Sequence, residues 1–105
     1  MANTQSSPAV GTNSVVVATK EQVASDVGGE IILLSLETGM YYGLGQVGAR
    51  IWDLLQRPMR AGDIRDTILA EYEVDAERCE RDVLALLRDL LDAGLIEVED
   101  SGEAA

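Results

Sequence analysis

This sequence contains no histidine and a single cysteine, Cys79. Histidine is the commonest general base and the commonest metal ligand, so its absence removes the usual catalytic and metal-binding arrangements. One cysteine forms neither an intrachain disulfide nor a Cys-x-x-Cys clamp, which is consistent with a reducing cytoplasm. We therefore expect no enzymatic activity, no bound metal and no cofactor.

Positive charge is also scarce. The 105 residues carry 8 lysines and arginines against 19 aspartates and glutamates, for a formal net charge of -11. Nucleic acids and anionic membranes bind clustered cations, which this sequence lacks. The N-terminal stretch MANTQSSPAVGTN has neither the basic nor the apolar region of a signal peptide, and no apolar run approaches the ~20 residues that span a membrane. We expect a cytoplasmic protein without nucleic-acid or membrane partners.

The chain is long enough for one domain with a modest core. Hydrophobic residues make up 47% of it and charged residues 26%, as in ordinary globular proteins. Residues 1–13 are polar and are predicted to form a disordered tail, and residues 99–105 a disordered acidic tail. The folded domain is therefore expected to span residues 14–98.

The first half of this domain favours β-structure. Val15, Val16 and Val17 predict an extended arm. Three further strands are predicted from alternating patterns: residues 22–27, 30–36 and 40–44. Gly28-Gly29 predicts a tight hairpin turn, and the stretch from Glu37 to Gly39 a second turn. The simplest arrangement is a three-stranded antiparallel meander.

The second half has the period of α-helices. Three helices are predicted: the first from Gln46 to before Pro58, the second capped by Asp63, and the third from Val74-Asp75 to before Gly94. A short extended piece, Leu95 to Val98, follows. The predicted fold class is α+β, with a three-stranded antiparallel sheet followed by three helices.

The third helix has a wide apolar surface. At about 100° per residue, one compact stripe faces the core: Cys79, Val83, Leu86 and Leu90. A second stripe widens the apolar arc to about 160°: Leu84, Leu87 and Leu91. Either this second stripe also packs in the core, or it lines a groove beside the third strand. That strand is predicted to be a sheet edge, and an edge beside an apolar groove suits the capture of an extended peptide.

The junction GMYYGLGQVGARIWDLL, from Gly39 to Leu55, holds two of the three tyrosines and the only tryptophan. It resembles the PqqD-like family, whose members read approximately Tyr-Tyr-x-Leu-Asn-x-x-Gly-x-x-Ile-Trp here. The matching positions are Tyr41, Tyr42, Leu44, Gly48, Ile51 and Trp52. Asp82-Val83 and the pattern from Leu87 to Leu95 also match. Gly45 replaces the usual Asn and is a weaker helix cap.

This resemblance, which covers about Gln22 to Val98, implies a winged helix-turn-helix-like domain. Such domains bind leader peptides of ribosomally synthesised, post-translationally modified peptides as an extra strand on the third strand, against the third helix. The wording of the junction is most similar to proteins of lasso-peptide clusters, which deliver the precursor to a cysteine leader peptidase and then to a cyclase. The expected peptide-binding residues are Met40, Tyr41, Tyr42, Gly43, Leu44, Leu84, Leu87, Arg88 and Leu91.

Two alternatives remain at this stage. A peptide chaperone for a radical enzyme would use the same cleft with a different partner. A winged-helix DNA-binding regulator would need a basic third helix, yet residues 75–92 carry six acidic residues against three arginines. The sequence predicts Trp52 in the core. It leaves open which of Tyr41 and Tyr42 faces a bound peptide.

Overall fold

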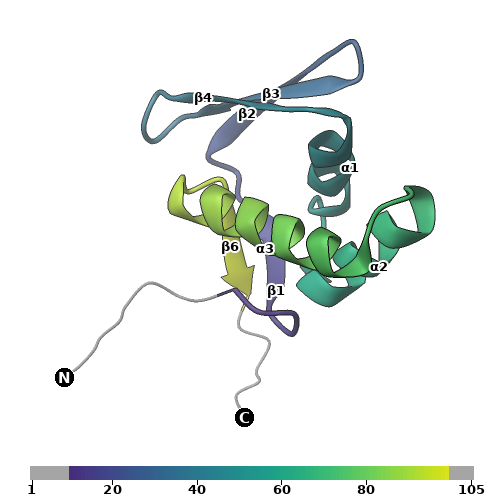
Figure 1. The fold of residues 1–105 in the computed structure, drawn as a ribbon. Coiled ribbons are helices and arrows are strands. Elements are labelled where there is room, and N and C mark those ends of the chain that lie inside the picture. The colour runs from purple at the N-terminus through teal and green to yellow at the C-terminus, as the bar shows by residue number, and fades with distance from the viewer. Residues whose placement is uncertain (1–9, 100–105) are drawn as a thin grey trace, which may run out of the picture.

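The structure, a computed structural model, describes residues 10–99. Two small antiparallel sheets and three helices make up this part of the chain (Figure 1). The elements in order are β1 (Val15–Ala18), β2 (Gln22–Val27), β3 (Glu30–Ser35), β4 (Tyr41–Leu44), α1 (Gln46–Leu54), β5 (Met59–Arg60), α2 (Ala61–Glu71), α3 (Ala76–Asp92) and β6 (Ile96–Glu99). The predicted α+β class, with a three-stranded antiparallel sheet and three helices, is confirmed.

The larger sheet has the strand order β2-β3-β4 and is the predicted meander. Gly28 and Gly29 form its first turn with φ angles of 65° and 91°, a region that only glycine enters at little cost. Leu33 pairs with Tyr42, and Ile31 with Leu44. These four side chains share one face of the sheet and pack in or against the core.

The smaller sheet joins the two ends of the described chain. β1 lies between β5 and β6 and pairs with both in antiparallel fashion, so that Val15 lies opposite Glu99. The extended arm predicted at Val15 to Val17 is therefore a central strand, with Val16 fully buried. Glu99 belongs to β6, so its assignment to a disordered tail is wrong: the backbone of this residue pairs with a neighbouring strand.

The predicted N-terminal tail falls largely outside the described residues, as do residues 100–105 of the C-terminal tail. Within the described part, Val10 is only 4% exposed and belongs to the core. The carbonyl of Thr12 accepts a hydrogen bond of 2.9 Å from the Gly62 amide. The packed chain thus begins by Val10, before the predicted boundary at residue 14.

Local signals set the ends of α3 as predicted. The side chain of Asp75 accepts a hydrogen bond of 3.0 Å from the amide of Arg78, and Gly94 follows the helix with a φ of 76°. The predicted cap of α2 is wrong, because that helix already begins after Arg60. Asp63 lies in the first turn instead, where its charge is favourable to the positive end of the helix dipole.

All three helices lie on one side of the larger sheet (Figure 1). Trp52 of α1 is buried in the core, as predicted. Gly48 of α1 lies so close to β4 that an added Cβ would be 3.1 Å from the Cβ of Leu44. The absence of a side chain at Gly48 therefore allows α1 to follow β4 directly and to pack against its end.

We expect Gly48→Ala to destabilise the fold. Alanine favours helix over glycine by about 1 kcal/mol, but here it would press on a buried leucine in a packed core, which costs about 1 to 3 kcal/mol. The net loss should be about 1 kcal/mol in the free energy of unfolding, measured by urea denaturation. Gly45→Asn is the control: its Cβ would have no atom within 4 Å, and asparagine is a better helix cap than glycine, so the variant should be neutral or slightly stabilising. A Gly48→Ala variant as stable as the wild type would contradict the close packing of α1 on β4.

Candidate functional site

β4 is an edge strand, paired within the described residues only with β3. The amide of Ser35 donates a hydrogen bond of 2.9 Å to the carbonyl of Met40, just before β4 begins. Hydrogen-bonded pairs alternate along an antiparallel ladder, so Tyr42 bonds to β3 while the backbone groups of Tyr41 and Gly43 point away from it. Among residues 10–99, β4 therefore presents a short row of donors and acceptors without backbone partners at its open edge.

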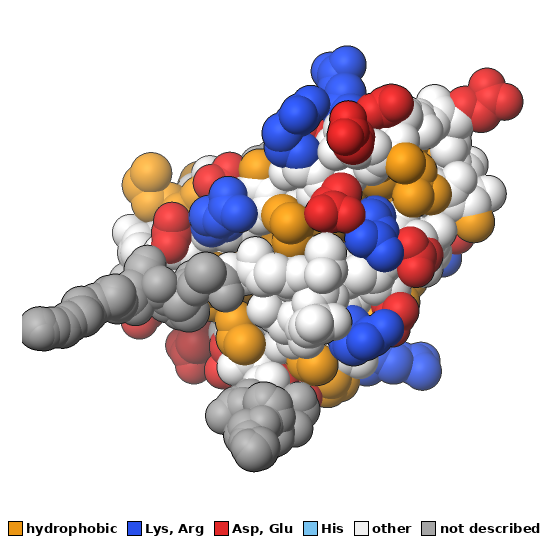
Figure 2. Space-filling view, turned by 60° about the horizontal axis from the view of Figure 1, so that its bottom comes forward, with side chains coloured by type: hydrophobic (Ala, Val, Ile, Leu, Met, Phe, Trp, Pro, Cys, Tyr) orange, Lys and Arg blue, Asp and Glu red, His pale blue; other side chains and the backbone are white. Residues whose placement is uncertain are grey.

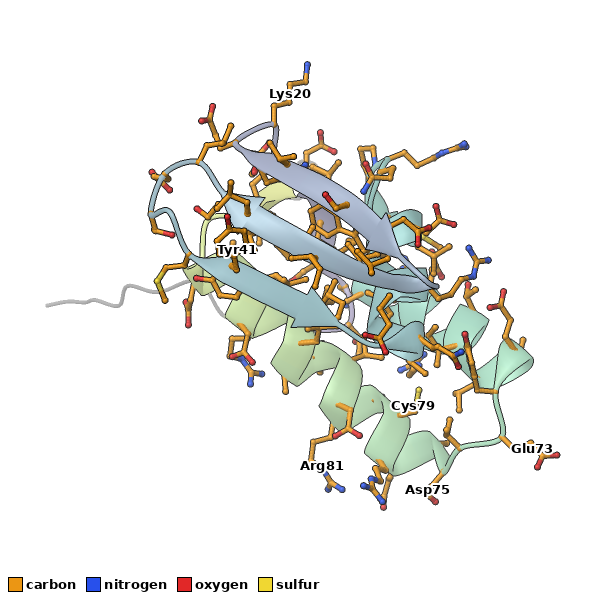
Figure 3. The ribbon with its side chains drawn as sticks, turned by 90° about the horizontal axis from the view of Figure 1, so that it is seen from above. Lys20, Tyr41, Glu73, Asp75, Cys79 and Arg81 are labelled. Carbon is orange, nitrogen blue, oxygen red and sulfur yellow. The ribbon has the colours of Figure 1, made fainter. Side chains whose placement is uncertain are left out.

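The two neighbouring tyrosines have different surroundings. Tyr42 is half-buried and packs against the core, and Leu44 is buried on the same face. Tyr41 points to the opposite face and is 70% exposed (Figure 3). Met40, just before the strand, is exposed as well. Tyr42 is thus the structural tyrosine, a choice that the sequence left open.

The buried face of α3 differs from the predicted one. Four of its residues are buried: Cys79, Val83, Leu87 and Leu90. Leu87 has no exposed surface, so its predicted place in an open groove is wrong. Leu86, predicted in the core, is only half-buried. At about 100° per residue the buried arc spans about 80°, with Leu86 on one flank of it and Leu84 and Leu91 on the other.

A pocket of about 580 Å³ lies on the Leu86 flank, between α1 and the N-terminal half of α3. It opens just beyond the end of β4, because Val47 and Gly48 at the start of α1 form one wall. The opposite wall is apolar too: Cys79, Val83 and Leu86. None of the nine residues predicted from the sequence lines this pocket.

Leu84 and Leu91 lie on the other flank of α3. The carboxylate of Glu80, one turn before Leu84, accepts a hydrogen bond of 2.7 Å from Arg65 of α2. Leu84 and Leu91 share that flank by helical geometry, which turns them toward the α2 side rather than toward the pocket. Arg88 is exposed and lies still further around the helix. In the sequence, an apolar residue at the start of the first helix, Val47, was a signal for the pocket that our prediction did not use.

Charged side chains surround the mouth of the pocket. Glu73, Asp75 and Asp82 contribute three acids against one arginine, Arg78, which pairs with Asp82 at 3.6 Å. Burial raises the pKa of the Cys79 thiol, and the nearby carboxylate of Asp82 raises it further. This thiol is therefore held in its protonated form, which is a poor nucleophile.

Residues 10–99 contain no group of three or more acidic or cysteine side chains placed to hold a metal ion. Within the same range, none of the helices is long and apolar enough to cross a membrane. On the face shown in Figure 2, acidic and basic side chains are interspersed, without the basic cluster that nucleic acid requires.

Comparison with known proteins identifies the family. The profile of Coenzyme PQQ synthesis protein D (PqqD) matches residues 30–96 of this chain. Because the match covers more than half of the sequence, the chain belongs to the PqqD family. The matched segment contains both β4 and α3, the two elements that border the candidate site.

Two solved structures are similar in fold and sequence. One is TbiB1 in complex with the TbiA(beta) leader peptide, at 42% identity and a TM-score of 0.70, covering 77% of this chain and 94% of that one. The other is a lasso peptide synthetase B1 complexed with the leader peptide, at 26% identity and a TM-score of 0.68, covering 78% and 96%. Comparison with curated proteins gave no match.

An ion pair joins α1, which forms one wall of the pocket, to α2. Arg50 of α1 donates two hydrogen bonds to Glu71 of α2, at 2.9 and 2.8 Å, and a third to Asp53. The bonded guanidinium holds the pKa of the Glu71 carboxyl below its ordinary value of 4.5. A lowered carboxyl pKa means that the pair stabilises the fold above that value and that this contribution is lost as the pH falls through the folded-state pKa.

We therefore expect Glu71→Gln to lower the melting temperature at pH 7. The difference from the wild type should shrink below pH 4.5 and disappear once Glu71 is protonated in the native wild type. Thermal melts of both proteins between pH 7 and pH 3 measure this. Glu97→Gln, at an exposed residue without an ion pair among the described residues, is the control and should melt like the wild type at pH 7. A Glu71→Gln difference that is constant with pH would exclude this role of the pair.

Proposed function

We propose that this chain is a non-catalytic adaptor that binds the leader peptide of a ribosomally synthesised precursor, in a lasso-peptide pathway, as an added strand on β4. The observation that carries the proposal is the free backbone edge of Tyr41 and Gly43, directly followed by an apolar pocket. Both similar structures contain a leader peptide, which supports the same class of ligand here.

Strand addition explains why the site has these parts. A peptide paired with the backbone of Tyr41 and Gly43 gains hydrogen bonds that depend little on its sequence. If it continues past the end of β4, it reaches Val47 and the pocket, where an apolar side chain would be covered by Leu86. The acids at the mouth of the pocket favour a neighbouring lysine or arginine in the peptide.

The adaptor would present the bound leader to other proteins. In our proposal these partners are a cysteine leader peptidase and a cyclase, because this chain has no histidine and its one thiol is held protonated. A peptide chaperone for a radical enzyme would use the same strand edge, and the partner enzyme distinguishes it. The acidic α3 argues against a DNA-binding regulator.

The two flanks of α3 supply a matched test. Leu86 and Leu84 are both half-buried leucines on the same helix, but only Leu86 lines the pocket. Leu86→Asp should weaken binding of the leader peptide by roughly 30-fold, about 2 kcal/mol, because a charge would enter an apolar contact. Leu84→Asp should bind with near wild-type affinity.

Isothermal titration calorimetry with a synthetic leader peptide of a lasso-peptide precursor measures both affinities. Circular dichroism and thermal melts establish that both variants remain folded. If Leu84→Asp weakened binding and Leu86→Asp did not, the peptide site would lie on the α2 flank of α3. If both variants bound the leader peptide with wild-type affinity, α3 would not be part of the peptide site.

A further inference from the structure

The segment that joins α2 to α3 forms part of the pocket. Glu73, Val74 and Asp75 all line the pocket, and we call these three residues the loop wall. Figure 3 shows Glu73 and Asp75 on this segment, next to the first turn of α3. Within residues 10–99, neither Glu73 nor Val74 makes a hydrogen bond to another backbone group. The position of the loop wall therefore depends on the elements at its two ends.

Local hydrogen bonds hold both ends of the loop wall. At the α3 end, the side chain of Asp75 accepts a hydrogen bond from the amide of Arg78. At the α2 end, the amide of Tyr72 donates a hydrogen bond of 2.9 Å to the carbonyl of Ile68, and the side chain of Tyr72 packs against the core. The loop wall thus follows the end of α2, and its distance from α1 depends on how α2 is placed against α1.

The ion pair of Arg50 and Glu71 fixes the end of α2 against α1. Glu71 is the last residue of α2, and Arg50 lies between Gly48 and Ile51, two residues of α1 that line the pocket. Nε and Nη2 of Arg50 donate to the two carboxylate oxygens of Glu71 at 2.9 and 2.8 Å, a paired geometry that sets orientation as well as distance. No other side-chain hydrogen bond joins α1 to α2 within the described chain. The pair therefore connects the α1 wall of the pocket to the start of the loop wall.

This ion pair lies near the surface, with side-chain exposures of 33% for Arg50 and 38% for Glu71. An ion pair this exposed contributes at most modestly to the stability of a fold. It does restrict where the end of α2 lies, and a binding site whose walls are already in place loses less conformational entropy when a ligand binds. We therefore expect the pair to affect binding at the pocket more than folding.

We infer that Arg50 and Glu71 are positioning residues for leader binding: their ion pair keeps the loop wall at the distance from α1 at which the pocket fits an apolar side chain of the leader. This role rests on the proposed function. Neither Arg50 nor Glu71 lines the pocket, so the pair acts through the wall and not through contact with the peptide. Breaking the pair leaves the chemistry of the pocket lining unchanged and loosens only its geometry.

The chain offers matched controls for this pair. Arg50 also donates a hydrogen bond of 2.9 Å to Asp53, which belongs to the same helix. Glu71→Gln and Asp53→Asn each remove one negative charge beside the same guanidinium, but only Glu71→Gln breaks the link between two helices. Glu80→Gln is a second control, because Glu80 accepts a hydrogen bond of 2.7 Å from Arg65 and joins α3 to α2 outside the pocket lining.

Calorimetry with a synthetic leader peptide of a lasso-peptide precursor measures the affinities. We expect Glu71→Gln and Arg50→Gln each to weaken binding at least roughly fivefold, and the double variant to bind no more weakly than either, because the two residues act as one unit. Asp53→Asn and Glu80→Gln should bind like the wild type. Thermal melts establish that every variant is folded at the temperature of the titration.

A second measurement needs no peptide. Cys79 lines the pocket, is only 5% exposed and is the only cysteine of the chain, so its rate of alkylation by iodoacetamide reports how often the pocket wall opens. We expect Glu71→Gln to be labelled at least roughly threefold faster than the wild type, and Asp53→Asn at the wild-type rate. Mass spectrometry of the intact protein follows the labelling.

Wild-type leader affinity of both Glu71→Gln and Arg50→Gln overturns the inference and leaves the proposed function intact. Effects of opposite sign also overturn it, because one variant removes a negative and the other a positive charge, and opposite effects would mean that these charges act on the peptide directly. If the wild type does not bind the leader peptide, the proposed function fails and the labelling decides alone. Faster labelling of Glu71→Gln then supports the positioning of the loop wall by the pair, and an unchanged rate excludes it.

Discussion

The burial of one face of α3 determines the rest of this structure. Leu87 has no exposed surface, and Cys79, Val83 and Leu90 are buried with it. These residues cover only about 80° of a helix whose apolar arc is about twice as wide, so both flanks carry leucines that the core does not fully cover. On the α1 side this incomplete cover forms the pocket at Leu86. The candidate site is thus a consequence of how a helix with a wide apolar arc packs in a small domain.

Because residues alternate along a strand, β4 contributes side chains to the core and also leaves backbone groups open for a ligand. Tyr42 packs inward and bonds to β3, which fixes the strand in place. The backbone of Tyr41 and Gly43 remains free at the open edge. The strand has four residues, and a short edge limits pairing with other copies of the chain. Gly48 brings α1 against the end of β4, so that the open edge and the pocket are adjacent.

Local patterns predicted most of the fold. The meander, its glycine turn, the cap at Asp75 and the end of α3 at Gly94 depend on neighbours in the sequence, and all are confirmed. The smaller sheet was not predicted as a sheet, because Val15 pairs with Glu99 across almost the whole described chain. The edge position of β4 followed from strand order. The position of the pocket could not be predicted from the sequence. Leu84, Leu86 and Leu87 are equally apolar, and only packing against α1 and α2 decides which of them is buried.

The central claim, that the leader peptide adds to the open edge of β4, is tested most directly by amide hydrogen exchange measured by NMR with and without the leader. The account predicts that exchange at Tyr41 and Gly43 slows strongly when the leader is bound, because their amides gain hydrogen bonds. Exchange at Tyr42, already bonded to β3, should change much less. Unchanged exchange at Tyr41 and Gly43 in a chain saturated with leader would contradict strand addition at β4.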